Sequence, residues 1–287
     1  SSLIEGFNSA SALSPLVRLR DGRWIPHFPS RLYRRGRDIG WIREVLEGAI
    51  YLLISNLFDT SSKEADWILD DYLDNRYLNP PYAYVIWNKK SNWFDYGGFS
   101  PQPNLLAGLM PHLDRDEPEI YIWMFFNAWA SCYREEINAM VEHPSPILGF
   151  SNVAHPKTSD EANAVMWLRY MFVYGNDKGL YIGRAIPRAW FRNGENISAE
   201  RVSTKYGEVS VVYKSFVKRG SIAADVDLSI KAKPAEMFIR FRHPDKKPIS
   251  CVTINGVKTD KFDPVKGDID IGGMNGKSEI AVSYNDL

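Results

Sequence analysis

Glu142 opens a proline-rich segment, residues 142–157, that precedes the last helical pattern of the chain. An inverting glycosidase needs one carboxylic acid to protonate the leaving oxygen and one carboxylate to activate water, about 6.5–9.5 Å apart. Glu142 is the best candidate for the carboxylate, as general base. The alternative is an ordinary solvated glutamate at the end of a helix. Glu135 and Glu136, a little upstream, fit a solvated helix face better.

Residues 76–99 form a second unusual segment, rich in aromatic and amide side chains. Aromatic planes stack on the apolar faces of sugar rings, while amides and carboxylates hydrogen-bond to hydroxyls. A structureless connection of about 20 residues is uncommon in a compact domain unless it is functional. Asp95 is a candidate second carboxylate, although capping of the Gly97-Gly98 turn is the favoured explanation for it. The predicted substrate-binding residues here are Tyr84, Trp93, Asp95 and Tyr96, and His143 joins them from the first segment.

A third segment, residues 31–40, carries four arginines and is followed by Trp41. Guanidinium groups match carboxylates geometrically, so Arg37 and Trp41 are candidates for a subsite that binds an anionic sugar. Ion pairing with neighbouring Asp and Glu is the commonest alternative. Nucleic-acid binding is disfavoured, because 35 Lys and Arg balance 35 Asp and Glu and no nucleic-acid motif is present.

Composition narrows the remaining possibilities. No apolar run approaches the ~18 residues of a membrane-spanning helix, so no span is expected. Cys132 and Cys251 fall in different halves, and we expect free thiols. Phosphate-binding, dinucleotide-binding and zinc motifs are absent, and the five histidines show no ligand spacing, so no cofactor or metal is predicted.

The hydrophobic period changes near residues 174–178. Before this point apolar residues recur at helical spacing, and after it short alternating runs are separated by Gly, Pro and Asn. We therefore predict an α+β multidomain chain, with a helical domain over 1–176 and an antiparallel β-sandwich over 177–287. The expected strands are 209–216, 222–230, 237–242, 250–254 and 280–284, and Asn255-Gly256 predicts a tight hairpin.

Five helical patterns precede the break. They follow Asp38, cover 61–75, start at Ser100-Pro101, run from 116–118 to 133 or 141, and start at Thr158. Ser61 and Thr158 each begin a capping box. In the last helix, the residues expected to face inward are Ala162, Val165, Leu168, Met171 and Phe172. If consecutive helices are antiparallel, the three unusual segments share one end of the helical domain, and the site is expected there.

Several sequence stretches resemble the C-terminal part of six-hairpin (α/α)6-barrel glycosidases. The stretch of residues 183–190 is similar to the one that joins barrel to sandwich in large bacterial glycosidase-like proteins. The stretches are Gly22-Arg23-Trp24-Ile25-Pro26, Gly40-Trp41, Glu47-Gly48-Ala49, Gly97-Gly98-Phe99-Ser100-Pro101-Gln102-Pro103, Glu142-His143-Pro144 and Gly183-Arg184-Ala185-Ile186-Pro187-Arg188-Ala189-Trp190.

This resemblance implies an incomplete (α/α) toroid followed by a sandwich, and glycoside hydrolysis as the activity. It implies that Glu142, in the loop before the last inner helix, is the catalytic base. A complete barrel has twelve helices, so the chain resembles a C-terminal fragment, or one half of a two-chain assembly. The general acid is then expected in sequence that is absent here. The missing part, or a second copy, would cover an exposed apolar edge.

Two other functions remain open. One is a non-catalytic carbohydrate-binding or scaffold protein that kept the fold and lost the acid. The other is a lyase acting on uronate sugars, in which Tyr96, His143 and Arg37 would abstract a proton. In each case the expected partner is a carbohydrate, and we expect a secreted or periplasmic location.

Overall fold

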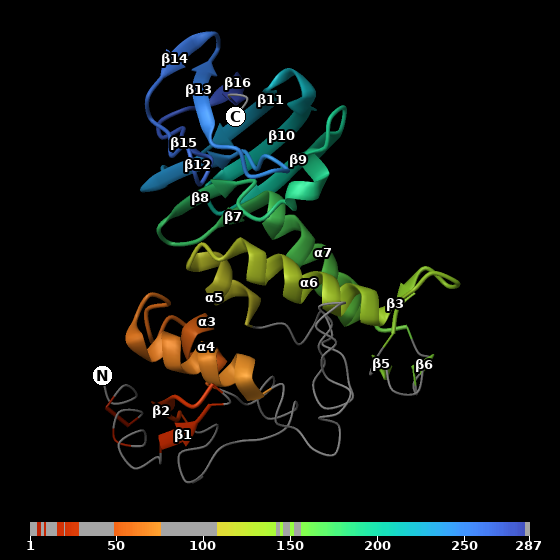
Figure 1. Cartoon of the computed structure of the whole chain (residues 1–287), viewed down its shortest axis with the longest axis vertical. Helices are drawn as coiled ribbons and strands as arrows, with labels where there is room; N and C mark the ends of the chain where they lie inside the picture. Colours follow the sequence, from red (N-terminus) through yellow and green to blue (C-terminus); the bar gives the residue numbers. More distant parts are fainter. Residues whose placement is uncertain are drawn as a thin grey trace. The chain divides into compact units, whose positions relative to one another are not determined.

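The computed structural model describes residues 5, 6, 9, 16–19, 21–28, 49–75, 108–141, 144, 145, 150, 151 and 156–284. The chain divides into two compact units, Ser1–Val165 and Met166–Leu287. Helices dominate the first unit and strands the second, as Figure 1 shows, so the chain belongs to the α+β class. No helix among the described residues is long and apolar enough to cross a membrane.

The first unit begins with an antiparallel hairpin of β1 (Leu16–Arg18) and β2 (Trp24–Pro26). Val17 and Ile25 lie opposite each other on its inner face and pack with Leu19 against Trp67. The helices that follow are α3 (Ile50–Ile54), α4 (Lys63–Asn75), α5 (Leu109–Asp114), α6 (Pro118–Cys132) and α7 (Thr158–Phe172). Between α6 and α7 lie β3 (Tyr133–Arg134), β4 (Ala139–Met140), β5 (Pro144–Ser145) and β6 (Phe150–Ser151).

Pro118 occupies the first turn of α6, as the sequence predicts. The predicted extension of this helix to residue 141 is wrong, because Tyr133 is extended and starts the β3–β4 hairpin. Asn138 closes its turn with a left-handed backbone (φ 49°), and the Tyr133 hydroxyl donates to Asn138 Oδ1 at 2.8 Å. Asparagine tolerates this conformation better than most residues, so the hairpin is locally encoded.

The starts of α4 and α7 differ in detail from the predicted capping boxes. The Ala65 amide donates to Ser62 Oγ at 3.2 Å, so the cap of α4 is Ser62 and not Ser61. In α7, Thr158, which was predicted to cap the helix, is already its first helical residue. The predicted inner face of α7 is confirmed at Met171, which is buried, and wrong at Val165, which is 64% exposed. Ala164 and Trp167, which were not predicted, are buried as well.

The second unit contains two sheets. The six-stranded sheet has the order β14-β13-β16-β11-β10-β9, and every neighbouring pair is antiparallel. Its strands are β9 (Asn196–Thr204), β10 (Gly207–Phe216), β11 (Ser221–Ile230), β13 (Ile249–Ile254), β14 (Val257–Thr259) and β16 (Gly276–Tyr284). The predicted strands 209–216, 222–230, 250–254 and 280–284 and the Asn255-Gly256 hairpin are confirmed.

The four-stranded sheet has the order β15-β12-β8-β7. Its strands are β7 (Val173–Gly175), β8 (Gly179–Ile182), β12 (Glu236–Arg240) and β15 (Asp268–Asp270), and β12 corresponds to the predicted strand 237–242. β8 and β12 are parallel, which corrects the expectation of purely antiparallel pairing. Parallel neighbours need a long crossover, and here the crossover contains β9, β10 and β11.

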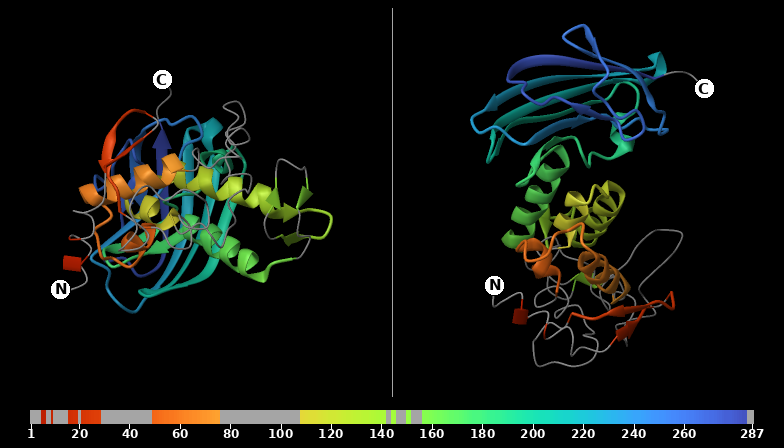
Figure 2. Two further views of the ribbon diagram at one scale, coloured as in Figure 1. Left: turned by 90° about the horizontal axis from the view of Figure 1, so that it is seen from below. Right: turned by 90° about the vertical axis from the view of Figure 1, so that its left-hand side faces the viewer.

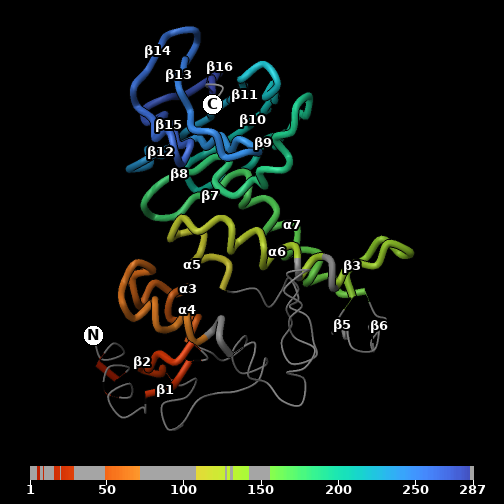
Figure 3. Tube along the Cα trace, viewed as in Figure 1, coloured from red at the N-terminus to blue at the C-terminus, as the bar shows by residue number. Residues whose placement is uncertain are grey.

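Figure 3 traces the chain through the two sheets, which share one hydrophobic core. In β10, β11 and β16 of the large sheet, alternate residues face this core. The fully buried members from both sheets include Val209, Val211, Tyr213, Ala224, Leu228, Ile280 and Val282, and Leu180, Ile182, Met237, Ile239 and Ile269.

Gly183 packs closely against this core. Its φ of +74° is in the left-handed region, and a Cβ there would lie 2.3 Å from Tyr213 Oη and 2.9 Å from the Arg240 carbonyl oxygen. The Tyr213 hydroxyl donates to that same carbonyl. Arg184, the next residue, places its guanidinium 3.4 Å from the centre of the Tyr181 ring. The stretch of residues 183–190 therefore begins at a position that favours glycine.

We predict that Gly183→Ala destabilises the second unit by roughly 2–4 kcal/mol, since left-handed strain and overpacking each contribute about 1–3 kcal/mol. Gly194→Ala is the matched control, because Gly194 also has a positive φ (+87°) but no atom within 4 Å of the added Cβ. Gly194→Ala should lose only the part of the unfolding free energy that comes from left-handed backbone strain. Urea unfolding followed by tryptophan fluorescence measures both, and equal losses would contradict the steric explanation.

Candidate functional site

Every side chain that the sequence nominates for the site lies outside the described residues. These are Arg37, Trp41, Tyr84, Trp93, Asp95, Tyr96, Glu142 and His143. The described part of the chain nevertheless contains the elements from which each of the three predicted site segments departs. The geometry of these departure points can therefore be compared with the predicted shared end.

The segment that contains Glu142 is closed at its base. Val141 pairs with Pro156 in an antiparallel bridge. The Val141 amide donates to the Cys132 carbonyl at 2.9 Å, and the Lys157 amide donates to the Met140 carbonyl at 2.9 Å. Residues 141 and 156, which flank this segment, therefore lie side by side next to the end of α6 and the start of α7.

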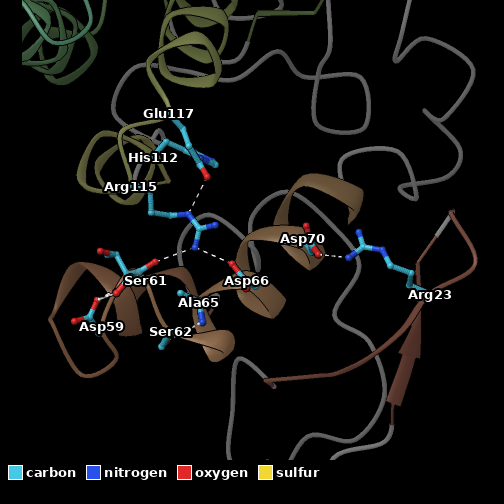
Figure 4. A network of polar contacts seen from close by, with 11 residues as sticks. Arg23, Asp59, Ser61, Ser62, Ala65, Asp66, Asp70, His112, Arg115 and Glu117 are labelled. Atoms are coloured by element: carbon cyan, nitrogen blue, oxygen red, sulfur yellow. Dashed lines mark hydrogen bonds and ion pairs between the residues drawn. The ribbon is translucent and has the colours of Figure 1, made fainter. Parts of the chain in front are cut away.

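A cluster of polar contacts joins the start of α4 to the start of α6 (Figure 4). Arg115, between α5 and α6, donates to the Thr60 carbonyl at 2.9 Å and forms ion pairs with Asp66 at 2.8 Å and Glu117 at 3.0 Å. His112 Nδ1 lies 2.6 Å from the other oxygen of Glu117. Because His112 is buried and Arg115 is mostly buried, their contacts with Glu117 are partly shielded from water, whereas the Asp66 side chain is 53% exposed.

The ionisation of Glu117 follows from this environment. Partial burial by itself would raise the pKa of the Glu117 carboxyl. Hydrogen bonds from His112 and Arg115, together with the charges of these residues, outweigh burial and hold that pKa below its ordinary value. Glu117 is therefore ionised at neutral pH and is unsuited to act as a general acid there.

A second group of contacts fixes the N-terminal hairpin on α4. Arg23 donates to Asp70 at 2.6 Å, and its orientation is set by Asp21 at 2.7 Å. Buried His27 places its Nδ1 3.1 Å from buried Asp71. Within the described residues the buried Nε2 of His27 has no hydrogen-bond partner. Residue 28, after which the arginine-rich segment begins, is thus held beside the second half of α4.

The pairing of His27 with Asp71 was not predicted. The residues are 44 positions apart, and no local pattern in the sequence connects them. The contact between Nδ1 and the carboxylate fixes the orientation of the imidazole ring. Phe28 and Trp67 stack beside this pair with ring centres 6.4 Å apart, so its described surroundings are largely apolar.

α4 and α6 point in the same direction. Both run from left to right in Figure 1, and the right-hand view of Figure 2 shows both nearly end-on. Their starts are joined through Arg115. With 13 and 15 residues they are each about 20 Å long, so their C-terminal ends lie on the same side of the first unit. Residues 76–99 follow the end of α4, and the segment from residue 142 follows α6 through the short β3–β4 hairpin.

The described polar groups between α4 and α6 make structural contacts with one another. Arg115 is committed to three acceptors, and Glu117 is committed to Arg115 and His112. Over the described ranges, no group of three or more His, Cys, Asp or Glu side chains is placed to hold a metal ion. The bond-breaking chemistry that the sequence assigns to Glu142 stays a prediction.

Comparisons with known proteins give limited similarity. No protein-family model matches the sequence, and no curated protein matches it. Among solved structures, one described as a glycoside hydrolase has a TM-score of 0.33 and 11% identity over 64% of this chain and 33% of its own. A β-arabinofuranosidase of family GH127 has a TM-score of 0.34 and 8% identity over 66% of this chain and 32% of its own. The chain spans about a third of the length of these structures, and TM-scores at this level do not establish a common fold.

We predict that Arg115→Ala lowers the free energy of unfolding by roughly 2–3 kcal/mol, because Glu117 loses a charged hydrogen-bond partner in a partly buried site. Arg23→Ala is the control. Its side chain is 56% exposed, so water and salt screen its ion pairs and the loss should be markedly smaller. Chemical denaturation at low and high salt compares the two, and a larger loss for Arg23 would contradict the bracing role of Arg115.

We also predict a specific acid sensitivity. A carboxylate whose folded-state pKa is lowered stabilises the fold above its unfolded pKa, about 4.3 for Glu, and that contribution disappears as pH falls through the folded value. Glu117→Gln should therefore lose less stability than the wild type between pH 7 and acid pH. Glu136→Gln, in the exposed β3–β4 turn, should keep the wild-type sensitivity. Denaturation midpoints at a series of pH values provide the measurement.

Proposed function

We propose that this chain is the C-terminal part of a glycoside hydrolase. The proposed mechanism is inverting, with Glu142 as the general base. The observation that carries the proposal is that the predicted site segments begin on the same side of the first unit. The ends of α4 and α6 lie on one side of the first unit, and residue 28 is held against the second half of α4 through His27 and Asp71. This arrangement supports a cleft formed by the three predicted segments.

In the proposed site, Glu142 removes a proton from the water that attacks the anomeric carbon. Its backbone neighbour Val141 is fixed by the bridge to Pro156, which would limit the positions open to the carboxylate. Trp41, Tyr84, Trp93 and Tyr96 would stack on sugar rings, while Arg37, Asp95 and His143 would hydrogen-bond to substrate hydroxyls or a uronate carboxylate.

The proposal includes the fold that would complete this site. The helices of residues 1–176 would form part of an (α/α) toroid, and residues 177–287 a β-sandwich. The outer face of the β1–β2 hairpin supports a missing neighbour, since Leu16 is 57% and Trp24 62% exposed. An N-terminal barrel portion, which would also supply the general acid, or a second copy of the chain, would cover these side chains.

The test is Glu142→Gln in the complete protein, assayed with a panel of soluble glycosides that the wild type cleaves. We expect turnover to fall by at least about 100-fold with substrate binding retained, since a general base contributes about 10²–10⁴-fold. Glu136→Gln, exposed in the neighbouring turn, is the matched control and should keep wild-type turnover. Unchanged turnover in Glu142→Gln would refute the assignment of this residue.

The same assay separates the two alternative functions. Binding without turnover by the wild type would indicate a non-catalytic carbohydrate-binding protein. An absorbing unsaturated product from a uronate polymer would indicate a lyase, and Tyr96, His143 and Arg37 would then be the residues to replace.

A further inference from the structure

The outer face of the six-stranded sheet carries a hollow of about 450 Å³. This volume falls within the about 300–1,000 Å³ typical of sites for small ligands. The hollow spans β10, β11 and β16, and Asn255 of the β13–β14 hairpin closes one end. The side chains that define it are Ser210, Val212, Asp225, Asp227, Lys277 and Glu279.

Strand register places these side chains in two adjacent rows. Residues paired across neighbouring strands face the same side of a sheet, and the residues between them face the opposite side. Val211 and Val226, which lie between the rows, are buried in the core. The rows on the outer face are Val212, Asp225 and Glu279, and Ser210, Asp227 and Lys277.

The charges in the hollow are only partly compensated. Asp225 and Glu279 lie directly opposite each other, and like charges in this position destabilise a sheet. Lys214 Nζ lies 2.7 Å from Asp225 and neutralises it. Neither Asp227 nor Glu279 forms an ion pair with a described residue. Asp227 lies directly opposite Lys277, whose charge partly balances it, and Lys214 also interacts electrostatically with Glu279. The side chains of Asp227, Glu279 and Lys277 form no hydrogen bond with a described residue, so the two carboxylates can still accept from a ligand and Lys277 can donate to it.

The walls of the hollow are held in place by backbone contacts. Asn255 Oδ1 accepts from the Glu279 amide at 2.9 Å, and the Asn255 amide donates to the Glu279 carbonyl at 2.8 Å. Ser210 Oγ accepts from the Arg201 amide at 2.9 Å. A groove built on paired strands loses little freedom when a ligand binds, which favours recognition of a weakly held ligand.

The chemistry of the lining selects a hydroxyl-rich ligand. Free carboxylates accept hydrogen bonds from neighbouring hydroxyls, an ammonium group donates to ring and hydroxyl oxygens, and half-buried Val212 offers an apolar contact for C–H groups. A phosphate or another anion is disfavoured because three carboxylates line the hollow. A metal ion is disfavoured because these carboxylates do not form a ligand cluster in the described structure.

We propose that this hollow is an accessory saccharide-binding subsite of the second unit, which holds sugar units of a polymeric substrate without taking part in bond cleavage. The proposal rests on the proposed function for its ligand class. It assigns Asp227 and Glu279 as hydroxyl acceptors and Lys277 as the donor. The residues predicted for catalysis are not involved.

The test measures binding of the complete protein to a panel of soluble neutral polysaccharides built from pentoses or hexoses, by affinity electrophoresis and calorimetry. Chitosan oligomers form a separate arm for amino sugars. Asp227→Ala combined with Glu279→Ala should weaken binding at least tenfold. Asp260→Ala, at an exposed carboxylate outside the hollow, is the matched control and should bind as the wild type does. Thermal unfolding should change little in the double variant, because Glu279→Ala relieves repulsion with Asp225 while Asp227→Ala removes attraction to Lys277.

The outcomes separate this proposal from that of the catalytic site. Loss of polymer binding in the double variant, with turnover of small glycosides intact, supports the subsite. A preference for chitosan oligomers supports it with an amino sugar as ligand. Unchanged binding in the double variant, or no binding of any saccharide by the wild type, overturns it. Glu142→Gln should retain polymer binding in either case, so failure of the catalytic assignment would be recognised independently.

Discussion

Arg115 is the contact on which the relative position of α4 and α6 depends. Its guanidinium joins the carbonyl of Thr60 and the carboxylate of Asp66, at the start of α4, to Glu117 at the start of α6. A planar group with five donors serves several acceptors at fixed angles, which a lysine does not do. Because the starts of the two helices are held together and their directions agree, the positions of their ends follow.

A site built from loops needs such a rigid base, since loops by themselves seldom hold reacting groups within a fraction of an ångström. In the first unit, two kinds of interaction form this rigid support. Apolar packing places Val17, Leu19 and Ile25 against Trp67, and polar pairs then fix the position of the hairpin along α4. The packing is non-directional, whereas the polar pairs select one register. Together they position the places from which the predicted site segments depart.

Local pattern predicted much of the fold, and its failures have identifiable causes. β10 and β11 were predictable because their buried and exposed residues alternate, while β7 and β8 were missed because almost all their residues are buried. α6 ends at Cys132 because Tyr133 is extended and enters a hairpin whose turn contains the left-handed Asn138, and apolar spacing reveals neither feature. His27 and Asp71 meet through tertiary structure alone. The residues nominated for catalysis, including Glu142, lie outside the described part of the chain, so their arrangement stays a prediction.

The bridge between Val141 and Pro156 has a consequence for how such a protein can diversify. Once both ends of a connection are pinned by hydrogen bonds, its length affects stability only weakly, and doubling it costs about 0.6 kcal/mol in closure entropy. Insertions and deletions between these two residues would then leave the adjoining ends of α6 and α7 undisturbed. The sequence that follows His143 could then be exchanged, by evolution or by a protein engineer, to change what is recognised without displacing the supporting helices.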